Sequence, residues 1–309
     1  MNKIVGILVA LLVVAAIIVI GVYVIDPKLD FPLDRATVPM RFLFVGVGLL
    51  IAFAVYYATR ANNAWVIGTR EVVWMAIGAA LYAVFSWLFN SSVFIVPSLS
   101  QVALRPAIAI PMFFGYAFGP VVGFFSGAVG NMFGDALTGF GLSPQWSIGN
   151  GLVGFIAGLP LLFSNRKKSL DTVLLGGGAL TLVGMIIYLL NRTELNRIFY
   201  DDNKGIYGDA VISPYIAASL LIGFILVVIV RFVWRKNIDI ATAVTWSMLG
   251  NILGIGFAAI SDIWINGFTP AAAIVGEFLP AAGPNMIFAA ILVPLLVVAY
   301  AAVRRQSGR

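Results

Sequence analysis

Long apolar segments constrain this chain more than any other feature. Ten apolar runs, separated by charged or turn-forming residues, lie at 4–24, 42–58, 72–89, 102–117, 121–137, 148–163, 173–190, 216–233, 243–263 and 285–303. A helix needs roughly 20 apolar residues to cross about 30 Å of hydrocarbon, and its backbone must hydrogen-bond within its own segment. The sequence therefore predicts an all-α integral membrane protein with about ten transmembrane helices. The weakest span is 102–117, which is short and carries Arg105, Pro106 and Pro111, so we expect it to be kinked, tilted or only partly spanning.

Composition supports this class and excludes several chemistries. Of the 309 residues, 61% are apolar and 10% are charged, with a mean hydropathy of +1.02. There is no cysteine and no histidine, which excludes thiolate nucleophiles, imidazole bases and the usual zinc, haem and iron–sulfur ligands. We therefore predict no metal site and no cofactor. The basic residues are scattered in small groups at helix ends, which indicates membrane topology rather than a nucleic-acid partner.

Charge asymmetry predicts the orientation. With Lys3 on the cytoplasmic side, alternating spans place twelve basic residues inside and six outside, the latter accompanied by seven acidic residues. The positive-inside rule therefore predicts an even number of spans, with both termini cytoplasmic. The first run is too long for a typical signal-peptide core and is not followed by a small-residue cleavage site, so we expect a retained anchor.

Glycines recur every four residues in the centre of the chain. Gly115, Gly119, Gly123 and Gly127 share this spacing, which Gly130 and Gly134 and then Gly154 and Gly158 repeat. Small residues at this interval let helix backbones approach closely. Pro120 lies where one helix would end and the next begin, so the turn between them must be very short. Residues 138–146 are expected to form a compact external loop.

The run RPAIAIPMFFGYAFGPVVGFFSGAVGNMFGDALTGFGLSPQWSIGNGLVGFIAGL resembles the core of the substrate-binding (S) component of energy-coupling factor (ECF) transporters, which import vitamins and related micronutrients in prokaryotes. The resemblance covers about 150 residues and implies a six-helix core, fitted here by 72–89, 102–117, 121–137, 148–163, 243–263 and 285–303. It also implies that an Ala-x-x-x-Ala motif docks a membrane-embedded coupling subunit. The sequence MAIGAALYA contains this motif twice, as Ala76 with Ala80 and as Ala79 with Ala83.

Two departures from the family pattern divide the chain. We expect an N-terminal two-helix extension at 1–65, the first four core helices at 66–170, an inserted helix hairpin with a polar outer loop at 171–236, and the last two core helices at 237–309. Each addition contains an even number of helices, so the orientation of the core in the membrane is preserved.

Candidate substrate-binding residues are the ionisable and amide side chains at membrane depth in the outer half of this core. Ionisable groups there cost about 2.5–3.5 kcal/mol unless they have a partner or a wet cavity. The candidates are Arg105, Asn131, Asp135, Gln145, Trp146, Asn150, Asn251, Asp262, Trp264, Glu277 and Asn285. Together they suggest an outward-facing pocket with aromatic walls and amide donors, suited to a small polar ring.

Each candidate also has a purely structural interpretation. Arg105 would instead form an ion pair with Asp135 or extend to the headgroups, and Asn131 and Asp135 would link helices. Trp146 and Trp264 would belong to the interfacial aromatic belt. Asn150 would cap a helix. Glu277, just before LPAAGPN, would lie in water beside a loop.

The leading functional hypothesis is a capture subunit of an ECF-type importer, which is not an enzyme. It would bind a vitamin or related micronutrient and rely on a coupling transmembrane subunit and two ATPase subunits, because the chain has no phosphate-binding G-x-x-x-x-G-K-[ST] loop. A stand-alone secondary transporter is the alternative, although inverted repeats are not evident. A less favoured alternative is an intramembrane hydrolase that uses Asp135 and Asp262 as a carboxylate pair.

Overall fold

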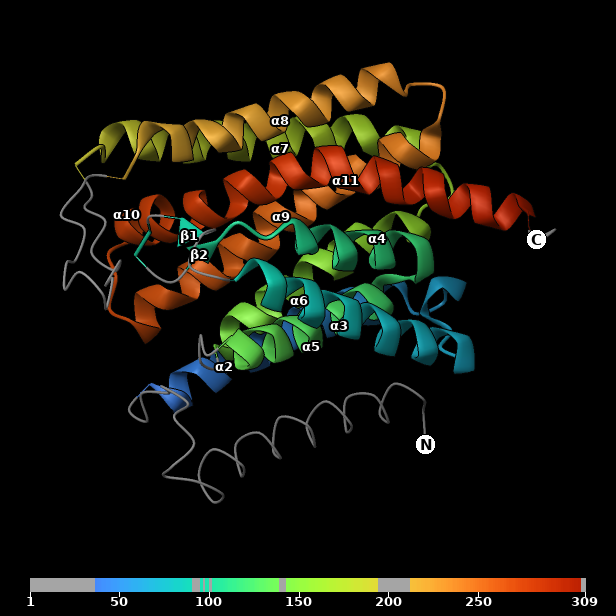
Figure 1. The fold of residues 1–309 in the computed structure, drawn as a ribbon, viewed down its shortest axis with the longest axis horizontal. Coiled ribbons are helices and arrows are strands. Elements are labelled where there is room, and N and C mark those ends of the chain that lie inside the picture. Colours follow the sequence, from blue (N-terminus) through green and yellow to red (C-terminus); the bar gives the residue numbers. More distant parts are fainter. Residues whose placement is uncertain are drawn as a thin grey trace.

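The computed structural model describes residues 37–90, 95–96, 98–99, 102–138, 143–193 and 212–306. These residues are mostly helical, and Figure 1 shows the helices running along the long axis of the molecule. The long helices are α2 (Val38–Thr59), α3 (Thr69–Phe89), α4 (Ala109–Phe118), α5 (Pro120–Thr138), α6 (Pro144–Gly158), α7 (Arg166–Leu190), α8 (Pro214–Val233), α9 (Ile238–Ile265) and α11 (Leu279–Gln306). The short elements are η2 (Asn63–Trp65), β1 (Ile95–Val96), β2 (Val102–Ala103), η4 (Pro106–Ile108), η5 (Leu159–Leu162), α10 (Pro270–Ala272) and η6 (Ala273–Phe278).

The predicted class of a multi-pass all-α membrane protein is confirmed. Within the described residues, six helical segments are long and apolar enough to cross a membrane, and Pro106–Phe118 is a shorter apolar one. The predicted span 4–24 lies outside the described residues, so the structure does not confirm the count of ten.

Contacts between helix ends define two ends of the bundle. Tyr116 near the end of α4 donates a hydrogen bond to Asp239 in the first turn of α9, and Arg166 at the start of α7 forms an ion pair with the same carboxylate. Asn62, after α2, donates to the carbonyl of Leu162 at the end of η5. We call the end of the bundle where these contacts lie the basic end. In the described part of the chain, the helix termini at this end carry Arg60, Arg70, Arg166, Lys167, Arg231, Arg235, Lys236, Arg304 and Arg305. The opposite end, called the β-strand end, carries β1 and β2.

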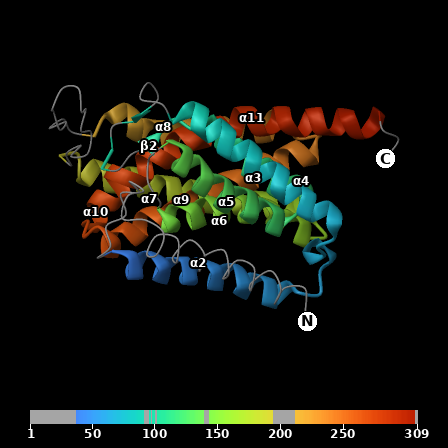
Figure 2. The same ribbon diagram turned by 60° about the horizontal axis from the view of Figure 1, so that its bottom comes forward.

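The helices form successive layers (Figures 1 and 2). Helices α7 and α8 lie side by side along one edge and pack on α9 and α11. Helices α9 and α11 in turn contact α4, and α9 packs closely on α6. Helices α3, α4, α5 and α6 pack together beyond them, and α2 covers α6 and α9 at the opposite edge.

Helices α5 and α6 approach closely enough for their backbones to touch. A Cβ added at Gly123 would collide with the carbonyl group of Gly154, and one added at Gly154 would collide with the carbonyl group of Gly123. The very short turn predicted before Pro120 is also found, because Gly119 alone separates α4 from α5. Its φ of 117° is a conformation that side chains other than glycine rarely adopt.

The expected span 102–117 is wrong at its start. Residues Val102–Ala103 are the strand β2, paired antiparallel with β1, and helical structure begins only at Pro106. A residue that precedes proline is disfavoured in the α region, and Arg105 accordingly has φ −116° and ψ 81°. Pro106 then suits the first helical turn, where its missing N–H is not needed.

Two expected loops are also partly helical. Helix α6 begins at Pro144, so Gln145 and Trp146 belong to its first turn rather than to a loop. The segment LPAAGPN lies inside α11, with Pro284 in the helix interior. Proline and glycine were read as loop signals here, but packing against neighbouring helices lets membrane helices retain them.

Candidate functional site

Arg105 lies at the β-strand end, between β2 and η4, and its guanidinium makes three side-chain hydrogen bonds. Nε donates to Asn90 Oδ1 over 2.8 Å, Nη1 donates to Asn131 Oδ1, and Nη2 contacts Asp135 Oδ1 at 2.9 Å. The last contact is an ion pair between side chains that are 14% and 9% exposed. Of the structural alternatives for Arg105, the ion pair with Asp135 is the one found.

Asn131 and Asp135 lie one turn apart on α5 and share the same network. Asn131 Nδ2 donates to Asp135 Oδ2 over 2.7 Å and to Ser147 Oγ of α6 over 3.3 Å. Asn90, which follows α3, also donates to Thr138 Oγ1 over 3.1 Å. We call Arg105, Asn90, Asn131, Asp135 and Ser147 the Arg105 cluster; it joins α3, α5 and α6 to the segment after β2.

A second set of polar contacts surrounds Asp262 near the end of α9. Gln145 Nε2 donates to Asp262 Oδ1 over 3.0 Å, and Trp146 Nε1 donates to Oδ2 over 2.8 Å. Arg41 of α2 donates to Gln145 Oε1 over 3.3 Å. We call these four residues the Asp262 cluster; it joins α2, α6 and α9, and Asp262 itself is fully buried.

Helix α6 connects the two clusters. Asn150 Nδ2 donates to the carbonyl of Trp146 over 2.9 Å, and Asn150 Oδ1 accepts from the Tyr82 hydroxyl of α3 over 2.7 Å. Asn150 is therefore a buried link between α3 and α6 rather than a cap at the helix start. The first two turns of α6 thus bring seven of the predicted residues together, namely Arg105, Asn131, Asp135, Gln145, Trp146, Asn150 and Asp262.

The remaining buried candidates lie on α9, η6 and α11. Asn251 of α9 donates to the carbonyl of Ala282 over 2.7 Å, and its buried Oδ1 has no hydrogen-bond partner among the described residues. Glu277 is fully buried in the π-helical segment η6, so the alternative that placed it in water beside a loop is wrong. Asn285 is buried in α11. Single π-helical turns in helices are frequent at functional positions.

The segment that contains β1 and β2 packs on η6. The backbone N–H of Leu99 donates to the carbonyl of Gly276 over 2.7 Å, and the Leu99 side chain is buried. Gly276 permits this contact, because a Cβ at this position would collide with the Leu99 side chain. Leu99, which lies between β1 and β2, is therefore directly beside the residue that precedes Glu277.

Trp264 differs from the other candidates. Its side chain is 57% exposed, and its ring packs on Phe44 of α2 with 5.6 Å between ring centroids. This position agrees with the aromatic-belt interpretation rather than with a wall of the polar clusters.

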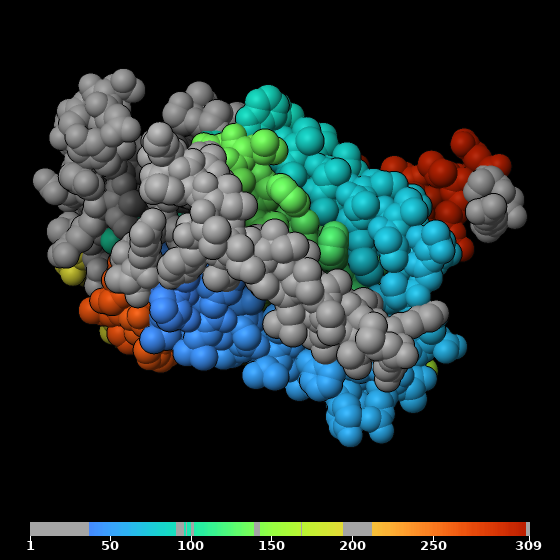
Figure 3. Space-filling model, turned by 90° about the horizontal axis from the view of Figure 1, so that it is seen from below, coloured from blue at the N-terminus to red at the C-terminus, as the bar shows by residue number. Residues whose placement is uncertain are grey.

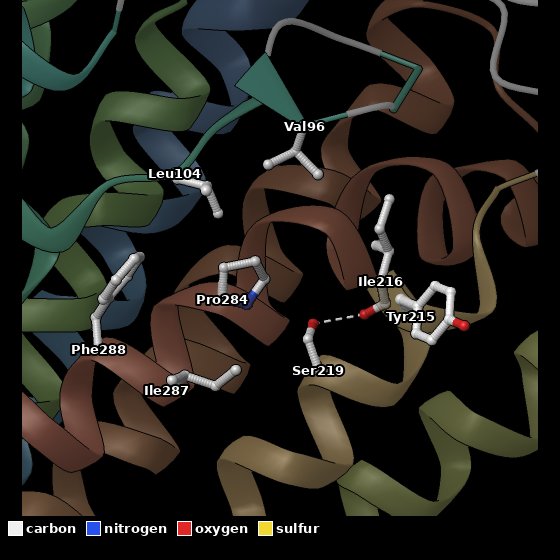
Figure 4. A pocket seen from close by; sticks show the side chains of 8 residues that line it. All are labelled: Val96, Leu104, Tyr215, Ile216, Ser219, Pro284, Ile287 and Phe288. Atoms are coloured by element: carbon white, nitrogen blue, oxygen red, sulfur yellow. Dashed lines mark hydrogen bonds between the residues drawn. The ribbon is translucent and has the colours of Figure 1, made fainter. Parts of the chain in front are cut away.

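An apolar groove of about 280 Å³ lies on the other side of the same β segment. Figure 4 shows Val96 and Leu104 above it and Pro284, Ile287 and Phe288 of α11 beneath it, with α8 forming the remaining wall. The Ser219 hydroxyl in this wall donates to the carbonyl of Ile216 within α8. Leu104 and Arg105 are consecutive, so this short segment separates an apolar groove from the Arg105 cluster.

The two alanine motifs on α3 have different environments. Ala79 and Ala83 are buried, and their backbones lie against Gly130 and Gly134 of α5. Ala76 and Ala80 are exposed. Figure 3 shows part of the α3 surface, in cyan, on the face seen from below. Only the Ala76 and Ala80 pair is therefore on a surface that a partner can reach.

Four network members were not among the predicted site residues: Arg41, Tyr82, Asn90 and Ser147. Tyr82 carried a signal, because it lies on the same helical face as Ala79 and Ala83 and is a polar residue on that face. Arg41 directly precedes the predicted span 42–58 and Asn90 directly follows the predicted span 72–89, so neither was placed at membrane depth. Their roles depend on contacts across long stretches of sequence.

These observations describe a multi-pass helical membrane protein with two connected polar clusters buried at one end. Residues 66–203 match the family described as ECF-type riboflavin transporter, S component. The resemblance to S components read from the sequence is confirmed by this match, which contains α3 to α7.

Curated relatives of this chain occur in Aliivibrio and Vibrio species. A UPF0397 protein of Aliivibrio fischeri (strain MJ11) is 36% identical over 104 residues, which are 33% of this chain and 55% of that protein. A UPF0397 protein of Vibrio atlanticus (strain LGP32) is 39% identical over 100 residues, 32% of this chain and 53% of that protein. The chain thus spans about half the length of these curated relatives. No solved structure matches it significantly.

Proposed function

We propose that this chain is the substrate-capture subunit of an ECF-type importer, which binds a vitamin or related micronutrient and relies on partner ATPases for uptake. The observation that carries the proposal is the match of residues 66–203 to the S component family. The buried polar clusters support it, because they fall within or against the matched helices at a single end of the bundle.

We propose that the substrate binds at the β-strand end, among residues of α6, α9, η6 and the Arg105 cluster. Buried amides, carboxylates and Trp146 would recognise a polar ring. Because the charge of Arg105 is balanced by Asp135 at 2.9 Å, we favour a neutral or cationic substrate over an anion. Riboflavin, named in the description of the family, is an uncharged polar ring compound and is the first ligand to test.

The exposed Ala76 and Ala80 pair is the proposed docking point for the coupling subunit. A flat surface of small residues permits close helix packing within a membrane. Replacing Ala80 with leucine should reduce recovery of the coupling subunit at least tenfold while leaving the chain folded. Ala54→Leu, at an exposed alanine of α2, is the matched control and should leave recovery unchanged. Equal recovery from both variants would contradict this docking point.

The hydrolase alternative receives no support from the two carboxylates. Asp135 is held by Arg105 and Asn131, whereas Asp262 is held by Gln145 and Trp146. A proton-sharing pair requires the two carboxylates to be partners of each other.

The test of the capture function is recovery of the full chain from its native membrane in mild detergent. We expect a coupling membrane protein, two ATPase subunits and a tightly held small molecule to accompany it. Recovery of the chain alone, with no small molecule, would overturn the proposal.

A further inference from the structure

The α7–α8 pair ends in a group of cations that the proposed substrate site does not use. Lys167 lies in the first turn of α7, and Arg235 and Lys236 lie in the turn between α8 and α9; all three are exposed. Next to them, the Trp234 side chain is 39% exposed. We call Lys167, Trp234, Arg235 and Lys236 the α7–α8 patch.

Two ion pairs hold the helix ends that carry this patch. Arg231 near the end of α8 contacts Asp171 of α7 at 3.4 Å, and Arg166 of α7 contacts Asp239 of α9 at 3.5 Å. The Tyr116 hydroxyl also donates to Asp239 over 2.7 Å. The two nearby acidic side chains are therefore already engaged, and the cations of the patch have no ion-pair partner within the described residues.

The backbone of the turn is also fixed. The N–H of Trp234 donates to the carbonyl of Val230 over 2.9 Å, and that of Asn237 donates to the carbonyl of Trp234 over 2.8 Å. Asn237 caps α9 by accepting from the N–H of Ile240. Arg235 and Lys236 are thus presented on a defined turn rather than on a long loop.

An apolar surface continues from the patch along α8. Phe232 and Val233 are 65% and 64% exposed, and Ile225 and Ile229 are 48% and 49% exposed. In Figure 1, α7 and α8 form the outermost layer of the molecule along this edge. Cations at the end of an exposed aliphatic helix, with a tryptophan next to one of them in sequence, match a molecule that has an anionic head and long hydrocarbon chains.

We propose that the α7–α8 patch binds the phosphate headgroup of an anionic phospholipid, whose acyl chains lie along the exposed face of α8. The guanidinium of Arg235 presents the planar donors that suit phosphate oxygens, and the two lysines add point charges. A soluble protein partner is less favoured, because the adjoining surface is aliphatic and belongs to a membrane-spanning helix.

The test is native mass spectrometry of the full chain with phosphatidylglycerol or phosphatidylcholine of identical acyl chains. Wild-type protein should retain phosphatidylglycerol at least tenfold better than phosphatidylcholine. The combined variant Lys167→Gln, Arg235→Gln and Lys236→Gln should lose this preference, since each basic residue near an anionic surface contributes a factor of about five.

The control is the variant Arg60→Gln, Arg304→Gln and Arg305→Gln, which removes the same charge at the same end of the bundle on other helices. It should keep the preference, and all three proteins should unfold at the same temperature in phosphatidylcholine. Equal loss in both variants, or no headgroup preference in the wild type, would overturn the proposal. So would a patch variant that keeps the lipid but loses the ATPase or coupling subunits, because the patch would then be a protein interface.

Discussion

The α3–α6 group and the α7–α8 pair differ in where their ion pairs lie and in how closely their helices pack. In the first, glycines bring backbones into contact, and the Arg105–Asp135 pair is buried within the helices. In the second, the pair Arg231–Asp171 lies at the helix ends, with the Asp171 side chain 75% exposed. The same residue types therefore have different energetic roles, because solvent reaches the carboxylate of Asp171 and is largely excluded from that of Asp135.

The largest expected effect is at Asp135. Asp135→Ala leaves the buried guanidinium of Arg105 without a counter-charge, which should lower the free energy of unfolding by about 3–5 kcal/mol. Thermal unfolding in detergent measures this loss. The double variant Arg105→Met and Asp135→Leu removes both charges and should recover much of it; a small effect of Asp135→Ala alone would contradict the buried-pair account.

The next effect concerns close helix packing. Gly123→Ala places a Cβ against the backbone of Gly154 and should cost about 1–3 kcal/mol, because backbone atoms on both helices must move apart. The same unfolding assay measures it. An unchanged unfolding temperature would show that α5 and α6 do not depend on this contact.

A glycine in the α7–α8 pair should behave in the opposite way. A Cβ at the exposed Gly176 of α7 meets no atom within 4 Å, so Gly176→Ala should stabilise the helix by about 0.5–1 kcal/mol. A rise in unfolding temperature is the expected readout. Destabilisation comparable to that of Gly123→Ala would remove the distinction between the two regions.

The smallest effect is expected at the Arg231–Asp171 ion pair, in which the Asp171 side chain is 75% exposed and that of Arg231 is 13% exposed. Asp171→Ala should change the free energy of unfolding by less than about 0.5 kcal/mol, because both water and salt screen its contact with Arg231. The free energy of unfolding of Asp171→Ala and Asp135→Ala should be measured at low and at high salt, because salt screens the Arg231–Asp171 contact more than the buried Arg105–Asp135 pair. A loss of several kcal/mol would mean that this end of the hairpin is as sensitive as the buried clusters.

Much of the helical framework follows from apolar periodicity, whereas the contacts of the site depend on tertiary structure. Apart from the start of the run 102–117, the described helices lie where the apolar runs predict them, because lipid requires long helices. The turn at Gly119 followed from the position of Pro120 alone. In contrast, the helical state of LPAAGPN and the burial of Glu277 depend on packing against α9, which the local sequence does not encode.

The sequence predicted most residues of the candidate site but not the hydrogen bonds that join them. Arg105 with Asp135 was one of the alternatives weighed, since two opposite charges at membrane depth need each other. The bond from Tyr82 to Asn150 and that from Arg41 to Gln145 join residues 68 and 104 positions apart. No spacing rule relates residues so distant, so these partners emerged only from the fold.

We propose that the buried clusters at the β-strand end bind a small molecule. The most direct measurement is the amount of small molecule released on denaturation from purified wild-type chain, compared with Asp262→Asn and the matched surface change Asp171→Asn. The account predicts near-stoichiometric release from the wild type and from Asp171→Asn, and at least tenfold less from Asp262→Asn. Release of no small molecule from the wild type, or equal amounts from both variants, would contradict it.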